Sequence, residues 1–189
     1  MRSPELSIVL PVYNEEDNIL PLYQKLTHAL KGLKKTYEII VVDDGSSDGS
    51  LEELKKLRKK DRTIRIIVFR KNFGQSAAIN AGFSHAKGEV IIVMDADLQN
   101  DPDDIKNLLK KMKDRYDVVS GWRFQRDDSL SKRIPSRISN WLHRKLTGLD
   151  IHDSGCTLKA YSKGSVEGLE LYGEMHRYIP ALIAAKGFR

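Results

Sequence analysis

Apolar runs alternate with amphipathic stretches along the first two thirds of the chain. Runs rich in valine and isoleucine cover residues 6–12, 37–44, 64–69, 89–96 and 116–122. Between them, apolar residues recur at helical spacing, most clearly over 18–33 and 74–86. Strands this apolar, separated by helices, are typical of parallel strands covered on both faces. The pattern therefore predicts an α/β fold with a mainly parallel sheet and helices on both faces.

Two of the predicted helices have recognisable first turns. Ser50 and Glu53 have the spacing of a capping box, which opens a charged helix over 51–60. Asp101 followed by Pro102 is a favoured N-cap and first helical position. We therefore expect a helix to begin at each of these points.

The regular alternation ends after Trp122. Residues 130–146 carry apolar side chains at helical spacing, bordered by basic residues. This stripe fits a helix on a lipid surface, and it fits equally a helix packed on the protein's own sheet. Residues 156–162 fit a further strand. The chain has no repeat or linker, so we expect a single domain over 1–189. Its last residues suggest a helix running into a strand, so we expect a truncated C-terminus.

Composition limits the partners. The chain has 189 residues, 31% of them charged, and a net charge of +6 at pH 7. This balance suits an anionic partner such as a nucleotide, a phospholipid head group or a nucleic acid. Nucleic acid is the least favoured, because the basic residues do not cluster with aromatic ones. The single cysteine, Cys156, allows no intramolecular disulfide. No run approaches the roughly 18 apolar residues of a membrane-spanning helix, so we expect this chain alone to be soluble.

Polar residues follow every predicted strand, where open α/β sheets bind their ligands. They are "PVYNEE", "DDGSSDG", "RKNFGQ", "DADLQ" and "GWR", in chain order. Asp95 and Asp97 lie two positions apart at the end of a strand, so extended backbone would point both carboxylates the same way. One acid could cap the next helix while the other is solvated, but Asp101 already supplies that cap. The pair therefore predicts a Mg²⁺ or Mn²⁺ site, completed by water and substrate phosphates.

Other residues at this edge fit a nucleotide. Tyr13 and Glu15 offer an aromatic face and an acceptor for a nucleobase, although such residues are more often simply exposed. Asp43 and Asp44 fit hydrogen bonds from ribose hydroxyls or base N–H groups, or an ordinary turn. Lys71 and Arg123 add positive charge near the phosphates, or are solvated surface bases. No Gly-rich dinucleotide or P-loop motif is present, which excludes those two classes of nucleotide site.

In this order and spacing, "SIVLPVYNEEDNI", "EIIVVDDGSSDGS", "KNFGQSAAINAGFSHAKGEVIIVMDADLQNDP" and "VVSGWR" resemble the family-2 inverting glycosyltransferases with a GT-A fold. Within that family, the chain is most similar to the polyprenyl-phosphate sugar transferases. The resemblance implies a UDP- or GDP-linked sugar donor and a dolichyl or undecaprenyl phosphate acceptor. It also implies work at the cytoplasmic face of a membrane. Many members carry Phe-Arg where this chain has Leu158-Lys159, and the family continues with a strand, a basic loop and often membrane helices.

The resemblance also implies roles for individual positions. The base-binding residues are Pro11, Tyr13 and Glu15, the nucleoside contact is Asp44, the metal ligands are Asp95 and Asp97 with help from Gln99, the donor-phosphate contacts are Arg123, Lys132 and Ser136, and the catalytic base is Asp153. The implied reaction is a single displacement in which the metal held by Asp97 assists departure of the nucleotide. Asp153 also fits a residue that merely closes the turn before Ser154-Gly155.

Three other functions share parts of this pattern. A polysaccharide-type transferase would use a sugar hydroxyl as acceptor, but its usual Gln-x-x-Arg-Trp motif is absent. A nucleotidyltransferase would have a Gly-rich loop where this chain has "YNEE". A nucleotide-binding module without turnover would show metal-dependent binding alone.

Overall fold

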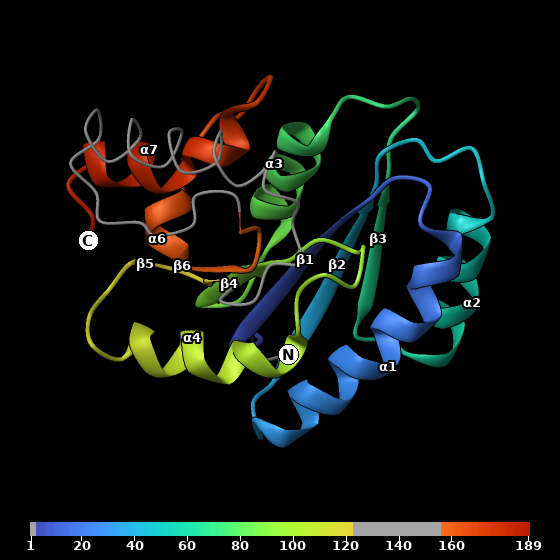
Figure 1. Cartoon of the computed structure of the whole chain (residues 1–189), viewed down its shortest axis with the longest axis horizontal. Coiled ribbons are helices and arrows are strands. Elements are labelled where there is room, and N and C mark those ends of the chain that lie inside the picture. The colour runs from blue at the N-terminus through green and yellow to red at the C-terminus, as the bar shows by residue number, and fades with distance from the viewer. Residues whose placement is uncertain (1–2, 123–155) are drawn as a thin grey trace, which may run out of the picture.

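A six-stranded sheet in the order β3-β2-β1-β4-β6-β5 forms the centre of the molecule (Figure 1). The structure is a computed structural model and describes residues 3–122 and 156–189. The strands are β1 (Leu6–Val12), β2 (Tyr37–Asp43), β3 (Ile64–Val68), β4 (Val90–Val93), β5 (Val118–Ser120) and β6 (Lys159–Ser162). The α-helices are α1 (Glu16–Gly32), α2 (Ser50–Lys60), α3 (Gln75–His85), α4 (Ile105–Met112), α6 (Lys163–Val166) and α7 (Ile179–Ala185). Two 3₁₀ helices are η1 (Pro102–Asp104) and η2 (Met175–Tyr178).

The predicted α/β class and mainly parallel sheet are confirmed. Strands β1, β2, β3 and β4 are parallel, while β6 runs antiparallel to both of its neighbours, β4 and β5. The further strand expected over 156–162 is β6, and it separates β5 from β4. β5 is shorter than the run 116–122, and all three of its residues are only partly buried. Since β5 lies at the edge of the sheet and pairs with β6 alone among the strands of the sheet, fewer of its residues are buried than in a central strand.

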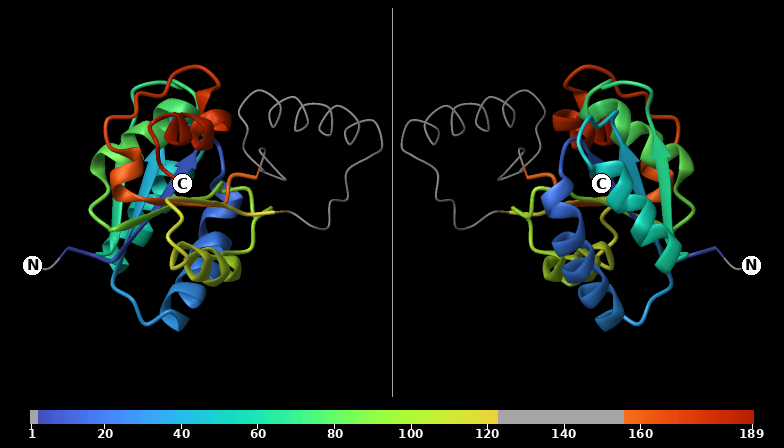
Figure 2. Two further views of the ribbon diagram at one scale, coloured as in Figure 1. Left: turned by 90° about the vertical axis from the view of Figure 1, so that its left-hand side faces the viewer. Right: turned by 90° about the vertical axis from the view of Figure 1, so that its right-hand side faces the viewer.

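Helices cover both faces of the sheet, as Figure 2 shows from two sides. Along β1, Ile8 and Leu10 belong to the apolar core shared with α1, α2 and α4, whereas Val9 belongs to the core shared with α3, α6 and α7. This division follows from the two-residue period of a strand. At Gly82 a Cβ atom would lie 2.2 Å from a methyl carbon of Val9. The small residue therefore allows α3 to pack closely on β1.

Both predicted helix starts are confirmed, because α2 begins at Ser50 and η1 begins at Pro102. The Asp101 carboxylate accepts a hydrogen bond from the Asp103 N–H at 3.0 Å, and Pro102 opens η1, which leads into α4. The capping box at Ser50 and Glu53 is wrong. Ser50 is already helical, and its hydroxyl accepts a hydrogen bond from the Glu15 N–H at 2.9 Å. The pairing with a loop distant in sequence replaced the local bond that the spacing suggested.

Some predictions for the later part of the chain cannot be compared with the structure. The proposed helix 130–146 lies outside the described residues. After α7, the main-chain N–H of Val118 donates a hydrogen bond to the carbonyl of Arg189 at 3.1 Å, beside the edge strand β5. Within residues 3–122 and 156–189, no helix combines the length and the apolar character needed to cross a membrane.

Candidate functional site

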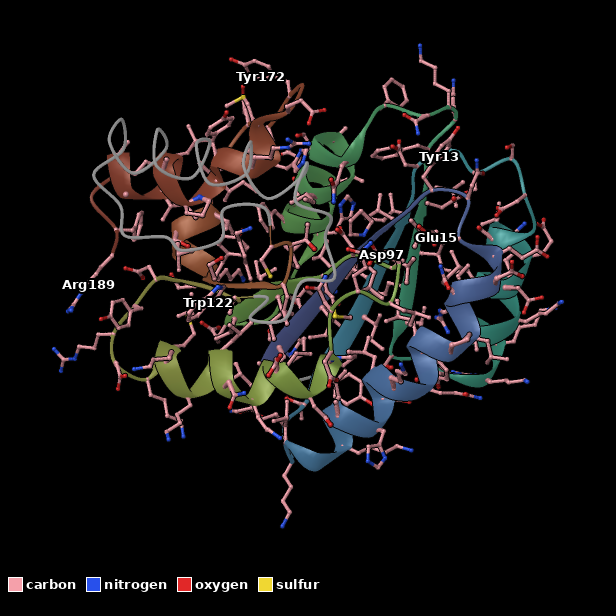
Figure 3. All side chains as sticks on the ribbon, in the orientation of Figure 1. Tyr13, Glu15, Asp97, Trp122, Tyr172 and Arg189 are labelled. Carbon is pink, nitrogen blue, oxygen red and sulfur yellow. The ribbon has the colours of Figure 1, made fainter. Side chains whose placement is uncertain are left out.

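A cavity of about 290 Å³ opens at the carboxyl ends of β1, β2 and β4, and we call it the carboxyl-end cavity. Strand ends, the following loops and the first turns of α3 supply its lining: Pro11, Val12, Tyr13, Glu15, Asp44, Asn72, Gly74, Gln75, Ala78, Asp95, Ala96 and Asp97. Tyr13, Glu15 and Asp97 can be found at this edge in Figure 3. The structure therefore brings together six predicted site residues from three separate motifs: Pro11, Tyr13, Glu15, Asp44, Asp95 and Asp97.

The loop after β1 is held against the loop after β2. Asn14 has a positive φ of 55°, and its side-chain oxygen accepts a hydrogen bond from the Ser47 N–H at 2.8 Å. The Glu15 N–H is held by the Ser50 hydroxyl, and the Glu15 carboxylate accepts a hydrogen bond from the Asn18 amide at 2.6 Å. Tyr13, the first residue of this loop, is 46% exposed. Its ring is therefore available for a flat ligand on a loop that is held in place.

A second connection joins the first turns of α1 and α2. The two oxygens of Asp48 accept hydrogen bonds from the N–H groups of Glu16, at 3.1 Å, and Ser50, at 3.0 Å. In return, the Glu16 carboxylate accepts a hydrogen bond from the Gly49 N–H at 2.9 Å. Burial raises the pKa of Asp48, but these hydrogen bonds outweigh it and hold the pKa below the usual range. Sequence reasoning missed Asn14 and Asp48, because each binds a residue more than thirty positions away: Asn14 binds Ser47, and Asp48 binds Glu16.

Asp43 and Asp44 have different environments although they are adjacent. Asp43 is buried outside the cavity lining, and its carboxylate accepts a hydrogen bond from the Ser46 N–H at 3.2 Å, so it closes a turn. Asp44 lines the cavity. Its two oxygens accept hydrogen bonds from the N–H groups of Phe73, at 2.7 Å, and Gly74, at 2.9 Å. Asp44 therefore holds the loop between β3 and α3 beside the cavity, and this structural role does not depend on a ligand.

The β3–α3 loop passes very close to the loop after β2. Gly45 has a φ of 71°, and a Cβ atom there would lie 2.5 Å from the main-chain carbon of Lys71. Only glycine suits both the positive φ and this approach. The Lys71 ammonium lies 5.2 Å from the ring centroid of Phe73, and Lys71 is outside the cavity lining. Its predicted phosphate contact therefore stays a prediction.

Asp95 and Asp97 both line the cavity, but not for the reason that the sequence suggested. β4 ends at Val93, and the chain bends after Asp95, with a positive φ of 61° at Leu98. The expected extended backbone through both acids is therefore wrong. The Asp95 carboxylate accepts a hydrogen bond from the Gln75 amide at 2.6 Å, and that of Asp97 accepts one from the Gln99 N–H at 3.1 Å. The bend, together with Gln75 on α3, sets the two carboxylates in the cavity wall.

This pair of carboxylates fits a divalent cation. Hard oxygen ligands suit Mg²⁺ and Mn²⁺, and an ion with few protein ligands takes the others from water and phosphates. In the part of the chain that the structure describes, no group of three or more His, Cys, Asp or Glu side chains has metal-binding geometry. Gln99 lines a different hollow, of about 610 Å³, beside α1 and η1. Among the described residues, Asp95 and Asp97 are therefore the candidate metal ligands in the carboxyl-end cavity. The predicted third ligand, Gln99, does not line that cavity.

Several predicted residues cannot be placed. Arg123, Lys132, Ser136 and Asp153 lie outside the described residues. Lys159, in the Leu158-Lys159 pair, is buried in β6, where its ammonium donates a hydrogen bond to the carbonyl of Cys156. Cys156 is buried, and its thiol donates a hydrogen bond to the side-chain oxygen of Asn100 at 3.6 Å. The roles implied for the four unplaced residues remain predictions.

Comparison with known proteins identifies the family. Residues 7–169 match the family described as Glycosyl transferase family 2. The chain is 41% identical over 187 residues to the dodecaprenyl-phosphate galacturonate synthase of Rhizobium johnstonii, a match that covers 97% of this chain and 55% of the relative. It is 41% identical over 179 residues to the undecaprenyl-phosphate 4-deoxy-4-formamido-L-arabinose transferase of Salmonella choleraesuis, covering 94% and 55%. The chain belongs to glycosyltransferase family 2, and it spans about half the length of these curated relatives.

Solved structures support the same fold. The mannosyltransferase PcManGT from Pyrobaculum calidifontis, in complex with GDP-Man and Mn²⁺, aligns with a TM-score of 0.68 and 22% identity, covering 100% of this chain and 54% of that protein. The glucosyl-3-phosphoglycerate synthase of Mycobacterium tuberculosis, in complex with UDP, aligns with a TM-score of 0.65 and 17% identity, covering 88% and 59%. The fold is therefore of the GT-A type, as the resemblance implied.

Proposed function

We propose that this chain is the catalytic domain of a metal-dependent inverting glycosyltransferase. It transfers a sugar from a UDP- or GDP-linked donor to a polyprenyl phosphate. The observation that carries the proposal is the carboxyl-end cavity, whose lining combines an exposed tyrosine, Glu15 and Asp44 with the Asp95–Asp97 pair. The two relatives are named as synthases or transferases of polyprenyl-phosphate sugars, which supports this choice of acceptor.

The nucleoside part of the donor lies against Tyr13, Glu15 and Asp44 in this proposal. The exposed ring of Tyr13 stacks on the base, since an aromatic face accepts any flat base. The carboxylate oxygens of Glu15 and Asp44 accept hydrogen bonds from base N–H groups or ribose hydroxyls. Both acids already bind protein donors, so they are oriented before the ligand arrives, which lowers the entropy lost on binding.

The diphosphate lies against Asp95 and Asp97 in the same cavity. Asp95 and Asp97 hold a Mg²⁺ or Mn²⁺ ion, and this ion, when bound, stabilises the charge of the departing nucleotide. The Gln75 amide fixes the orientation of Asp95, and the Gln99 N–H fixes that of Asp97. Arg123, Lys132 and Ser136 are proposed, from the family resemblance, to contact the donor phosphates as well.

The acceptor places few demands on a catalytic base. A lipid phosphate is already an anion near neutral pH, so Asp153 assists the attack less than it would for a sugar hydroxyl. The net charge of +6 suits an anionic membrane surface, where each nearby Lys or Arg contributes roughly 1 kcal/mol. We therefore place the reaction at the cytoplasmic face of a membrane that contains the lipid.

The test is a product assay on the full-length protein. The enzyme is incubated with Mn²⁺, a panel of UDP- and GDP-sugars, and undecaprenyl or dolichyl phosphate, and lipid products are identified by mass spectrometry. We expect one donor to give a glycosylated lipid phosphate, with inversion at the anomeric carbon in the NMR spectrum. Transfer only to oligosaccharides would support the polysaccharide-type alternative. Metal-dependent donor binding without any product would support a binding module.

A further inference from the structure

The segment after α6 is connected to the first turn of α3 through two residues, Ser76 and His176. The Ser76 hydroxyl accepts a hydrogen bond from the main-chain N–H of His176 at 3.0 Å, and it also lies 3.0 Å from the His176 Nδ1 atom. Ser76 is only 1% exposed. The two residues are a hundred positions apart, yet η2 lies against α3 at the top of Figure 1. The side chain of His176 thus reaches the buried first turn of α3.

The tautomer of His176 decides whether the Ser76 hydroxyl donates to Nδ1 or accepts from it. A serine hydroxyl has one hydrogen to donate. Since Ser76 already accepts from the His176 N–H, its own hydrogen is well placed for Nδ1 of the ring. Nδ1 accepts that hydrogen only when the imidazole is neutral and carries its proton on Nε2. The observed geometry therefore fits neutral His176.

The same turn of α3 carries residues of the carboxyl-end cavity. Gln75, next to Ser76, donates the 2.6 Å hydrogen bond to the Asp95 carboxylate. Gly74, the residue before it, has a φ of 92°, and its N–H is held by Asp44. Ser76 is therefore the sequence neighbour of the residue that orients the Asp95 carboxylate.

We propose that His176 is a positioning residue for Asp95, acting through Ser76 and the Gln75 amide. Its contact with Ser76 fixes the first turn of α3, and this turn orients the carboxylate that we assign to the metal and the donor diphosphate. The inference rests on the proposed function, because the orientation of Asp95 matters only if that carboxylate binds a metal-linked ligand. His176 does not line the carboxyl-end cavity, so in this proposal it contacts neither the metal nor the donor.

Charged groups around His176 influence whether it stays neutral. Burial lowers the pKa of His176. The Glu174 carboxylate, with an oxygen 4.0 Å from Nε2, raises this pKa, whereas the charges of Arg177 and of Lys159 on β6 lower it. The net effect is a lowered pKa. A folded-state pKa below the unfolded value favours the neutral ring, so the stability that this residue contributes is present above the ordinary histidine range and falls as pH falls. Protonation would place a hydrogen on Nδ1, facing Ser76.

Two substitutions separate the ring from its hydrogen bond. His176→Phe keeps an aromatic ring but removes the Nδ1 acceptor. His176→Asn keeps an acceptor near the position of Nδ1. His85→Phe is the matched control, because His85 is an exposed histidine at the C-terminal end of α3, far along the helix from Ser76. All variants are made in the full-length protein.

The first measurement is amide hydrogen exchange over 75–78 without nucleotide, and the second is the affinity for UDP and GDP with Mn²⁺ by calorimetry. In His176→Phe we expect exchange to be faster and affinity to be weaker, each by about tenfold, the effect of one lost hydrogen bond. Both should recover in His176→Asn and stay unchanged in His85→Phe. The affinity of the wild-type protein should fall between about pH 7 and pH 5 more steeply than that of His176→Phe, since only the former has a ring at this contact that takes up a proton.

Three results would overturn the inference. Unchanged exchange in His176→Phe would show that the contact does not fix α3. Faster exchange with unchanged affinity would show that the turn does not orient Asp95. Should His176→Phe fail to fold, equal affinity at pH 7 and pH 5 in the wild-type protein would overturn it. A wild-type protein that binds neither nucleotide, but shows faster exchange in His176→Phe, would instead refute the proposed function and, with it, the assignment of Asp95 on which the inference rests.

Discussion

The two ends of the sheet carry acidic residues in opposite settings. At the amino end, the Glu38 carboxylate accepts hydrogen bonds from the Ser7 hydroxyl, the Arg65 guanidinium and the Lys87 N–H, each at 2.8 Å. Its side chain is only 9% exposed. At the carboxyl end, Asp95 and Asp97 also accept hydrogen bonds from the protein, but they line a cavity of about 290 Å³.

The difference separates structural acids from acids available to a ligand. Around Glu38 the chain closes the space itself, since a Cβ atom at Gly88 would lie 2.5 Å from the Ser7 nitrogen. Burial raises the pKa of Glu38, yet the hydrogen bonds from Arg65, Ser7 and Lys87 hold it below the usual range. A carboxylate surrounded by protein donors stabilises the fold, whereas one in a cavity wall can also bind a cation. Each substitution below changes a residue at one of these two ends.

The largest expected effect is on stability, at the amino end. Glu38→Gln leaves the Arg65 guanidinium without its counter-charge and puts an NH₂ group among donors, so the free energy of unfolding should fall by about 3 kcal/mol. Nucleotide affinity should not change. Chemical denaturation gives the first quantity and calorimetry the second, with the exposed acid Glu89→Gln as control. A variant as stable as the wild-type protein would mean that this network is not structural.

The next effect is on binding, at the carboxyl end. Asp97→Asn keeps the side-chain shape but removes a charge facing the cavity, so the affinity for UDP or GDP with Mn²⁺ should fall about thirtyfold, or about 2 kcal/mol. The thermal midpoint should change little, since Asp97 is only partly buried. Asp103→Asn, a nearby exposed acid, is the control. Equal losses in both variants would indicate a general charge effect and not a ligand at Asp97.

A smaller binding effect is expected at Tyr13. Tyr13→Ala removes an exposed ring from the cavity, and loss of one stacked base should weaken nucleotide binding by roughly 1–2 kcal/mol. Tyr172→Ala, which removes an even more exposed ring elsewhere, should have no effect. Because stacking does not involve the metal, the loss should be similar for UDP and for uridine. Normal uridine affinity in Tyr13→Ala would exclude stacking there.

The smallest effect concerns acid stability. Because the folded-state pKa of Glu38 is lowered, this residue stabilises the protein above the unfolded-state value of 4.5, and the stabilisation is lost as pH falls through the folded-state pKa. From about pH 5 to pH 3 the wild-type protein should therefore lose roughly 1 kcal/mol more than Glu38→Gln does. Urea denaturation of both proteins at each pH measures this difference. Parallel losses would assign the acid sensitivity to other groups.

The sequence predicted the layers of the fold and the gathering of acids, for identifiable reasons. The runs 8–12 and 39–42 are apolar because both faces of these strands are buried. The carboxyl ends of parallel strands meet at one edge, so the residues after them share a site. Local rules sufficed for these features, and for the Asp101 cap.

What the sequence could not predict depends on contacts between distant segments. The predicted capping box at Ser50 does not form, because the Ser50 hydroxyl accepts its hydrogen bond from the Glu15 N–H. The strand before Asp95 was predicted too long, since apolar residues continue into a bend that packs against the core. The contact between Ser76 and His176 spans a hundred residues and has no local pattern at all.

The central claim is that Asp95 and Asp97 in the carboxyl-end cavity bind a nucleoside diphosphate through a divalent cation. Titration calorimetry of the full-length protein with UDP and GDP, in Mn²⁺ and then in EDTA, tests it directly. We predict that at least one nucleotide binds in Mn²⁺ and that its affinity falls by at least about thirtyfold in EDTA, matching the loss in Asp97→Asn. Equal affinity with and without the metal would contradict the claim.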